Sequence, residues 1–319
     1  MKKEKLLIGR IPYINLFPFF YYLDKKCDCS GYRFIGGVPS ALNKMLREGR
    51  LDISPSSSIE YLENKKKYFI FPWFSISSKG PISSILLFSK YPLKELNGKN
   101  ISVSSDSETS SVLLKVILRE FISIKCRYKK TKFRSIKNAL TSSSAILLIG
   151  DEAMKEAKRQ SAVSSQLSTR KKTKASRLPT GQASITPAYR TGRPQPSLYI
   201  YDLGDLWFKY TGLPFVFALW IVRKDVLPQK MELVRKLAAD LLKAKKMAPE
   251  KFSLIAQQAP QKKWLAEKDL VKYWKCISYD FTEKHMEGLR LFEKYALKNK
   301  KIKCKMSAFT DTGETDKIV

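Results

Sequence analysis

The feature that most constrains the fold is a regular alternation of short apolar segments with amphipathic ones. Residues 5–11 and 32–37 have the composition of buried strands, and each is followed by a segment whose apolar residues have helical spacing. The same alternation returns at residues 96–121 and 144–157. Strands that alternate with helices predict βαβ units built around mostly parallel sheets. A chain of 319 residues is long enough to form two such α/β domains.

Two long apolar strands, expected at residues 82–90 and 213–222, bracket the middle of the chain. A simple mechanical interpretation is that both strands cross from one α/β lobe to the other and form a hinge. This predicts the two-lobed fold of type II periplasmic binding proteins, which close around a ligand. The first lobe is then discontinuous, with residues 1–89 and 212–319, and the second lobe comprises residues 90–211.

Residues 158–197 do not follow this alternation. The segment is rich in Ser, Thr, Lys, Arg and Pro, contains no acidic residue and has no sustained period. Such a composition buries too little apolar area to offset the entropy lost on ordering. We expect a disordered basic insertion in the second lobe, with a basic arm for an acidic partner as the alternative. Residues 306–319 are expected to be a frayed end.

The formal net charge of +31 raises the question of nucleic-acid binding. The lysines are scattered along the whole chain, and no helix-turn-helix, zinc or RNP signature accompanies them. We therefore expect no specific nucleic-acid partner, although so basic a surface should attract anions over a distance.

The cysteines and the amino-terminal residues bear on the compartment. Five cysteines are spread over the chain without a second pair at metal-binding spacing: Cys27, Cys29, Cys126, Cys276 and Cys304. Free thiols in a reducing compartment are the simplest interpretation. The basic start lacks the apolar core and cleavage site of a signal peptide, and no segment has the ~18 apolar residues of a spanning helix. We expect a soluble cytoplasmic protein without a membrane partner.

Several kinds of catalytic site are unsupported. The chain has a single histidine, His285, which we expect on the solvated face of a C-terminal helix, so a Ser-His-Asp triad is not predicted. Neither GxGxxG nor GxxxxGK[ST] occurs. We expect no nucleotide cofactor and no catalytic metal.

Hydroxyl and amide side chains recur where predicted strands lead into helices, at Asn15, residues 56–58, residues 83–84 and residues 109–111. Ligands of α/β sheets bind at the carboxyl ends of strands, and helix amino termini there favour anions. Each hydroxyl taken alone is more simply a helix N-cap. Their recurrence at four junctions favours a small anionic ligand.

The first of these junctions lies in IGRIPYINLFPFF, residues 8–20. The stretch is interpreted as a buried strand that ends at Asn15, with Pro18 in the first turn of the next helix. Asn15 is a candidate both for capping that helix and for touching a ligand.

Five segments together resemble the chorismate dehydratases of the futalosine route to menaquinone: IGRIPYINLFPFF, GVPSALNKMLREGRLDISPSSSIEY, GPISSILLFSK, LLIGDEA and YDLGDLWFKYTGLPFVFALW. They occur in the same order as in that family and cover most of the chain outside residues 158–197 and the tail. The resemblance implies the type II binding-protein fold. It also implies dehydration of chorismate to 3-[(1-carboxyvinyl)oxy]benzoate without metal or nucleotide.

The resemblance also assigns site residues. Asn15 stands at the family's active-site asparagine, and Ser84 stands at a serine that contacts a substrate carboxylate. Thr109 and Ser110 match a helix-start pair that implies a second carboxylate contact, and Ser57 is a weaker transfer. The implied chemistry relies on holding a dianion and orienting the departing hydroxyl, because loss of water makes the ring aromatic.

This sequence departs from the family pattern at Pro12 and Ile14, and the insertion at 158–197 is foreign to it. Besides a nucleic-acid-associated protein, which only the net charge suggests, two rival functions remain open. One is the sister enzyme that makes dihydroxynaphthoate, which uses a histidine in its second lobe, whereas residues 90–205 here contain none. The other is a non-catalytic binding protein for a small carboxylate. The sequence does not indicate an oligomeric state.

Overall fold

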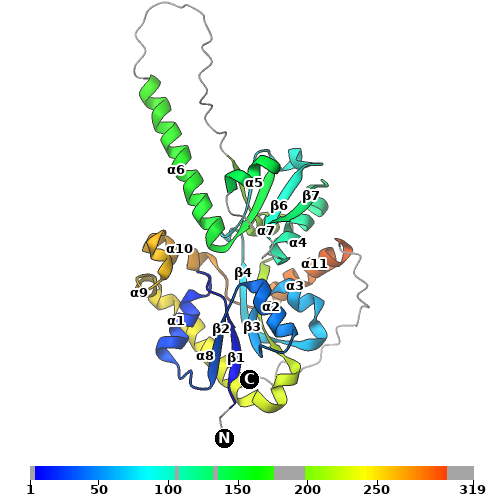
Figure 1. The fold of residues 1–319 in the computed structure, drawn as a ribbon, viewed down its shortest axis with the longest axis vertical. Coiled ribbons are helices and arrows are strands. Elements are labelled where there is room, and N and C mark those ends of the chain that lie inside the picture. The colour runs from blue at the N-terminus through cyan, green and yellow to red at the C-terminus, as the bar shows by residue number, and fades with distance from the viewer. Residues whose placement is uncertain (1–3, 105–107, 132–135, 176–197, 300–319) are drawn as a thin grey trace, which may run out of the picture.

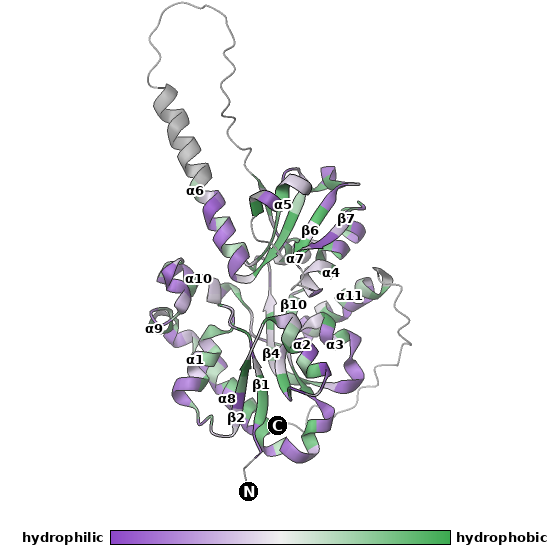
Figure 2. Cartoon of the chain, in the orientation of Figure 1, coloured by the Kyte–Doolittle hydropathy of each residue, from purple (hydrophilic) through white to green (hydrophobic). Residues whose placement is uncertain are grey.

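A computed structural model describes residues 4–104, 108–131, 136–175 and 198–299. Its framework is two five-stranded sheets that lie one above the other, with helices on their faces (Figure 1). Figure 2 shows the strands as the most apolar elements and the outer helices as the most polar. The two-lobed α/β fold predicted from the sequence is confirmed.

The first sheet has the order β2-β1-β3-β10-β4. Its strands are β1 (Leu6–Arg10), β2 (Tyr32–Gly36), β3 (Ile53–Ser57), β4 (Tyr68–Ser78) and β10 (Phe215–Arg223). Strand β1 is parallel to β2 and β3, whereas β10 is antiparallel to both β3 and β4. The late strand β10 is therefore an interior strand of a sheet begun more than a hundred residues earlier.

The second sheet has the order β7-β6-β8-β5-β9. Its strands are β5 (Ile85–Ser89), β6 (Asn100–Ser104), β7 (Arg127–Thr131), β8 (Ala145–Ile149) and β9 (Tyr199–Asp202). Strand β6 is parallel to β7 and β8, and β5 is antiparallel to β8 and β9.

The helices divide between the two sheets. Those that pack with the first sheet or follow it are α1 (Phe17–Lys26), α2 (Pro39–Arg47), α3 (Ser58–Glu63), α8 (Leu227–Met247), α9 (Phe252–Ala256), α10 (Glu267–Cys276) and α11 (Glu283–Asn299). Those of the second sheet are α4 (Glu108–Val116), which continues as a π-helix over Ile117–Phe121, α5 (Ile136–Ser142), α6 (Gly150–Ala175) and α7 (Leu203–Thr211). Short 3₁₀ helices occur at Lys65–Lys67, Leu93–Leu96, Lys224–Val226, Pro249–Lys251 and Pro260–Lys263. We call the first sheet with α1–α3 and α8–α10 lobe 1, and the second sheet with α4–α7 lobe 2.

The strands expected to cross between the lobes do not do so. Strand β5 pairs along its whole length with β8 and over residues 86–89 with β9, and the strands that β10 pairs with, among those described, are β3 and β4. The chain instead passes between the sheets at residues 79–84 and 212–214. The expected assignment of residues 85–89 to the first lobe is therefore wrong, because the backbone hydrogen bonds of β5 lie in the second sheet. The boundary near residue 212 stays a prediction.

The segment expected to be disordered begins as helix. Helix α6 continues to Ala175, so the expectation is wrong for residues 158–175. The first turns of α6 pack Ala153 onto the second sheet, and Glu156 accepts hydrogen bonds from Arg159 (2.8 Å to Nε) and Gln160 (2.5 Å). Such i,i+3 and i,i+4 contacts support a helix. The remainder of the expected insertion, residues 176–197, lies outside the described residues, as does the tail.

His285 is not on a solvated face. Its side chain is fully buried near the start of α11, with Nε2 3.1 Å from Ser278 Oγ and Nδ1 2.8 Å from Thr282 Oγ1. Burial, with Lys79 nearby, lowers the pKa of His285, so the ring is neutral where it serves these contacts. The expectation from the sequence failed because helix α11 packs this face inward.

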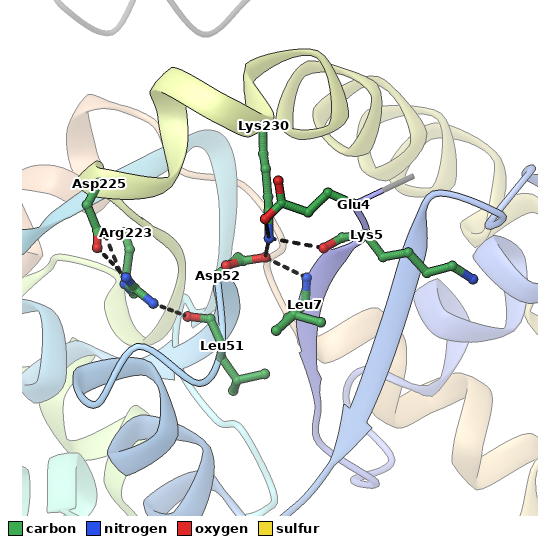
Figure 3. Close-up of polar contacts among 8 residues, drawn as sticks. All are labelled: Glu4, Lys5, Leu7, Leu51, Asp52, Arg223, Asp225 and Lys230. Atoms are coloured by element: carbon green, nitrogen blue, oxygen red, sulfur yellow. Dashed lines mark hydrogen bonds and ion pairs between the residues drawn. The ribbon is translucent and has the colours of Figure 1, made fainter. Parts of the chain in front are cut away.

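At the end of lobe 1 remote from lobe 2, a buried ion pair ties three segments together (Figure 3). Lys230 Nζ lies 2.8 Å from Asp52 Oδ2, which also accepts a 2.7 Å bond from the Leu7 N–H. The same ammonium donates to the Lys5 carbonyl at 3.1 Å. The start of β1, the approach to β3 and helix α8 are thereby joined.

Two further observations concern the described part of the chain. None of its helices has both the length and the apolar composition needed to cross a bilayer. Cys27, Cys29, Cys126 and Cys276 are free thiols, and Cys304 lies outside the described residues.

Candidate active site

Asn15 lies in a turn between β1 and α1, at the junction of the two lobes. Strand β1 ends at Arg10 rather than at Asn15, and the turn is closed by bonds from Leu16 N to the Tyr13 carbonyl (3.2 Å) and from Phe17 N to the Ile14 carbonyl (3.3 Å). The N-cap of α1 is Leu16, which makes no side-chain capping bond. The capping role considered for Asn15 is therefore not found.

The backbone of this turn is held by aromatic side chains from α10 and from the segment that follows it. Trp274 donates its indole N–H to the Ile14 carbonyl at 2.7 Å, and the Tyr279 hydroxyl donates to the Asn15 carbonyl at 2.7 Å. The Asn15 side chain itself has a buried Oδ1 without a hydrogen-bond partner among the described residues. A buried acceptor left unpaired costs free energy, so this atom is one that a ligand donor would satisfy.

Ser84 lies beside the same group of helices, where the chain enters lobe 2. Its hydroxyl is buried and accepts a 2.9 Å bond from the Tyr273 hydroxyl, which leaves the serine proton to donate elsewhere. The Ser84 carbonyl accepts from Gly150 N at 2.7 Å. Asp202 fixes the preceding residues, because its Oδ2 accepts from the backbone N–H groups of Ile82 (2.9 Å) and Ser83 (2.6 Å). Ser84 is thus held from both lobes.

Thr109 and Ser110 begin helix α4, as the sequence predicts. Both are buried, at 4% and 5% exposure. The Thr109 hydroxyl accepts a 3.1 Å bond from the backbone N–H of Ile59, so it bridges lobe 2 to the start of α3 in lobe 1. Its proton remains able to donate to a ligand.

Ser57 has an ordinary structural role. It is the N-cap of α3, and its hydroxyl accepts from Glu60 N at 3.4 Å and from Asn43 Nδ2 at 3.3 Å. These contacts account for the serine without a ligand, and its substrate contact stays a prediction.

The candidate residues therefore form two groups. The turn that bears Asn15 is linked to Ser84 through adjacent residues, because Trp274 donates to the Ile14 carbonyl and Tyr273 donates to Ser84. Ser57 and Thr109 meet at the first turn of α3. Among the contacts described for Asn15, Ser84, Thr109 and Ser57, none is made by a lysine or an arginine. Hydroxyl groups and helix starts are the available means of holding a carboxylate here.

The tyrosines at this junction act as donors. Burial raises the pKa of Tyr273, and burial also raises the pKa of Tyr279 well above its usual value. Both hydroxyls stay protonated at neutral pH, so each keeps donating to the site backbone or to Ser84.

Sequence reasoning missed the residues that hold the site. Tyr273, Trp274 and Tyr279 lie in YWKCISY, and Asp151 comes two residues after β8; none of these was among the expected site residues. An aromatic cluster in a polar C-terminal segment was the available signal, but nothing in it indicates which turn it contacts.

A separate cavity of about 440 Å³ opens beside the start of β4 and the end of β10, remote from lobe 2. Arg47 and Arg223, which line it, are already paired with Glu60 and Asp225. We therefore place the candidate active site at the junction of the lobes. The described residues contain no group of three or more His, Cys, Asp or Glu side chains arranged to hold a metal ion.

Comparison with known proteins points to one family. The family model described as menaquinone biosynthesis matches residues 6–173 and 184–298. Only residues 174–183 separate the two matched parts, so the expectation that all of residues 158–197 is foreign to the family is wrong for most of that stretch.

Two curated relatives have the same name. The chorismate dehydratase of Thermus thermophilus is 31% identical over 224 residues, which are 70% of this chain and 72% of the relative. The chorismate dehydratase of Campylobacter jejuni is 28% identical over 217 residues, 67% of this chain and 66% of the relative.

Solved structures support the fold alone. The protein AF1704 from Archaeoglobus fulgidus superposes with a TM-score of 0.68 at 16% identity, covering 95% of this chain and 100% of that one. The periplasmic aliphatic sulphonate binding protein of Escherichia coli gives 0.61 at 11% identity, covering 95% of each chain.

Proposed function

This chain belongs to the menaquinone biosynthesis family, and we propose on that basis that it is a hydro-lyase that dehydrates chorismate to 3-[(1-carboxyvinyl)oxy]benzoate. The observation that carries the proposal is the 31% identity with the chorismate dehydratase of Thermus thermophilus. The buried, unpartnered amide oxygen of Asn15 is consistent with it, because chorismate has a hydroxyl that could donate to this atom.

The reaction removes one ring hydrogen and the ring hydroxyl of chorismate as water. The ring becomes aromatic, and the enolpyruvyl ether and both carboxylates are kept. The thermodynamic drive is therefore large, and the protein must mainly orient the departing hydroxyl and exclude bulk water. We propose that the side-chain carboxylate of the substrate removes the ring proton.

In this proposal Asn15 binds beside the departing hydroxyl or the enolpyruvyl group. Its Oδ1 accepts a hydrogen bond from the hydroxyl, and its Nδ2 donates to the oxygen as the C–O bond breaks; the hydroxyl leaves as water with the proton that the substrate carboxylate has removed from the ring. The turn that bears Asn15 is held through its backbone carbonyls by Trp274 and Tyr279, so the side chain is preorganised.

The two substrate carboxylates are assigned to the hydroxyl groups of lobe 2. Ser84 accepts from Tyr273 and therefore points its proton away from that hydroxyl. Thr109 likewise accepts from Ile59 N. Thr109 and Ser110 thus supply neutral donors at the beginning of α4, and Ser84 supplies one just before β5. Ser57 is a weaker candidate for the same role. The proposal also includes a cytoplasmic location for the protein.

Alanine substitutions test this assignment. Asn15→Ala and Ser84→Ala should each lower kcat about 10²–10³-fold, the usual cost of losing one preorganised polar contact. Matched controls are Asn138→Ala and Ser142→Ala, which alter exposed side chains of α5 and should keep the parent rate. The measurement is aromatic product formed from chorismate, followed by absorbance and mass spectrometry, with folding checked by circular dichroism.

The outcome also separates the rival functions. A folded parent protein that binds chorismate without turnover would favour a binding protein for a small carboxylate. Parent turnover that both site variants retain in full would show that Asn15 and Ser84 are not the site.

A further inference from the structure

We propose that Asp151 is a positioning residue that couples docking of lobe 2 to the placement of the turn bearing Asn15. Asp151 lies in the first turn of α6 in lobe 2, whereas the turn belongs to lobe 1. The inference rests on the proposed function, because the orientation of Asn15 matters to catalysis only if Asn15 meets the substrate.

The carboxylate of Asp151 binds two segments of lobe 1 at once. Its Oδ1 accepts from the backbone N–H of Ile14 at 3.3 Å, and its Oδ2 accepts from Gln261 Nε2 at 3.2 Å. Gly150, immediately before Asp151, has φ +60°, a left-handed backbone conformation that glycine adopts at little cost. Both contacts are made across the junction of the lobes.

One face of α6 continues this junction along the helix. Lys155 and Lys158 follow Asp151 at i+4 and i+7, so the three share a face. Lys155 Nζ lies 5.1 Å from the centroid of the Trp264 ring, and Lys158 Nζ donates to the Trp264 carbonyl at 2.7 Å. Asp151, Lys155 and Lys158 therefore form a docking face against the segment between α9 and α10.

Ile14 is bonded from both lobes through two different peptide groups. Its carbonyl, in the Ile14–Asn15 peptide, is held by Trp274 of lobe 1, and its N–H, in the Tyr13–Ile14 peptide, by Asp151 of lobe 2. Separation of the lobes would release the N–H while the carbonyl stayed bonded. The orientation of the Tyr13–Ile14 peptide, which leads into Asn15, is then fully set only when lobe 2 is docked.

A carboxylate is the group that this arrangement requires. The Ile14 N–H and the Gln261 amide are both donors, so the side chain between them must supply two acceptors. Asparagine has the same shape but supplies one acceptor and one donor group. Asp151→Asn therefore keeps an acceptor for only one of the two donors unless the Gln261 amide rotates to present its Oε1, and it removes the charge that strengthens both bonds.

The test compares Asp151→Asn with Glu152→Gln, a matched change of charge at the adjacent, exposed residue of the same turn. Steady-state kinetics with chorismate gives kcat and KM. An independent readout is the indole N–H resonance of Trp274 in [¹⁵N]tryptophan-labelled protein, assigned with Trp274→Phe. This resonance reports the bond to the Ile14 carbonyl whether or not chorismate is turned over.

We expect Asp151→Asn to shift or broaden the Trp274 resonance and to lower kcat about 10–100-fold, with a smaller effect on KM. Glu152→Gln should change neither. If Asp151→Asn fails to fold, the exposed pair Lys155→Ala/Lys158→Ala tests the same docking face, with the same two readouts expected to move.

The inference is overturned if the substitution leaves kcat at the parent value, or if Glu152→Gln has an equal effect. It is also overturned if kcat falls while the Trp274 resonance stays unchanged. If the parent protein does not dehydrate chorismate, the proposed function fails by itself, and the resonance alone decides whether Asp151 holds the turn.

Discussion

The buried ion pair between Lys230 and Asp52 makes a quantitative prediction about stability. The side chain of Lys230 is 10% exposed and that of Asp52 6%, so neither charge is well solvated in the folded protein (Figure 3). Burial by itself would lower the pKa of Lys230, but the hydrogen bonds to Asp52 and Glu4 and the charges of these carboxylates together raise it, with Asp52 the larger contributor. The ammonium therefore stays charged beside its partner.

Replacing Lys230 by Met keeps the length of the side chain and removes the charge. Asp52 is then left with the Leu7 N–H as its remaining described donor, at 2.7 Å, and a buried carboxylate that has lost its counter-ion. Loss of one partner of a buried pair costs about 3–5 kcal/mol. Glu4, 3.3 Å from the ammonium but 68% exposed, adds little to this figure.

The assay is urea unfolding followed by circular dichroism, with Lys209→Met as the matched control. Lys209 pairs with Asp205 at i,i+4 and is 66% exposed, so its replacement should cost at most about 0.5 kcal/mol. The double variant Lys230→Met/Asp52→Asn should lose about 1–3 kcal/mol less free energy of unfolding than the sum of the two single substitutions. The reasoning is refuted if Lys230→Met costs no more than Lys209→Met.

The remaining predictions concern two buried polar groups. Burial lowers the pKa of His285, so just below pH 6.5 the unfolded chain binds more protons than the folded chain. The urea midpoint should therefore fall when the pH is lowered from 7.5 to 5.5. This fall should be smaller in His285→Gln. An equal fall in both proteins would contradict this. Thr109→Val leaves the buried Ile59 N–H unpaired and should cost about 1–3 kcal/mol in the same unfolding assay, whereas Thr109→Ser keeps the acceptor and should cost less. Equal losses would mean that the hydroxyl bond does not stabilise the contact.

The sequence predicted the architecture well where local pattern and tertiary packing agree. The α/β alternation and the helix start at Thr109 and Ser110, which lie in the first turn of α4, were both expected. In each case the preference of a few adjacent residues is also what the sheets require.

The errors arose where a distant segment decides the local structure. The apolar run after Arg10 was interpreted as strand, but Ile11 and Ile14 are buried in a turn that Trp274 holds. The polar surroundings of His285 suggested solvent, but α11 buries that face. Low apolar content suggested disorder at the end of α6, where helix-forming residues continue a helix already packed on the second sheet.

The candidate site was predictable only in part. Asn15, Ser84 and Thr109 could be proposed because strand-to-helix junctions gather ligands in α/β folds. Tyr273, Trp274 and Asp151 could not, since their partners lie from 137 to 260 residues away in the chain. No periodicity encodes such pairings.

The place of β10 between β3 and β4 has a consequence for how the protein is synthesised. Once β4 has left the ribosome, the edges of β3 and β4 that will pair with β10 stay unpaired until the whole of lobe 2 has been made. At 5–20 residues per second this delay is on the order of ten seconds. Lobe 2 can thus fold first as an uninterrupted stretch, while lobe 1, although begun earlier, is completed last and is the part of the nascent chain most in need of a chaperone.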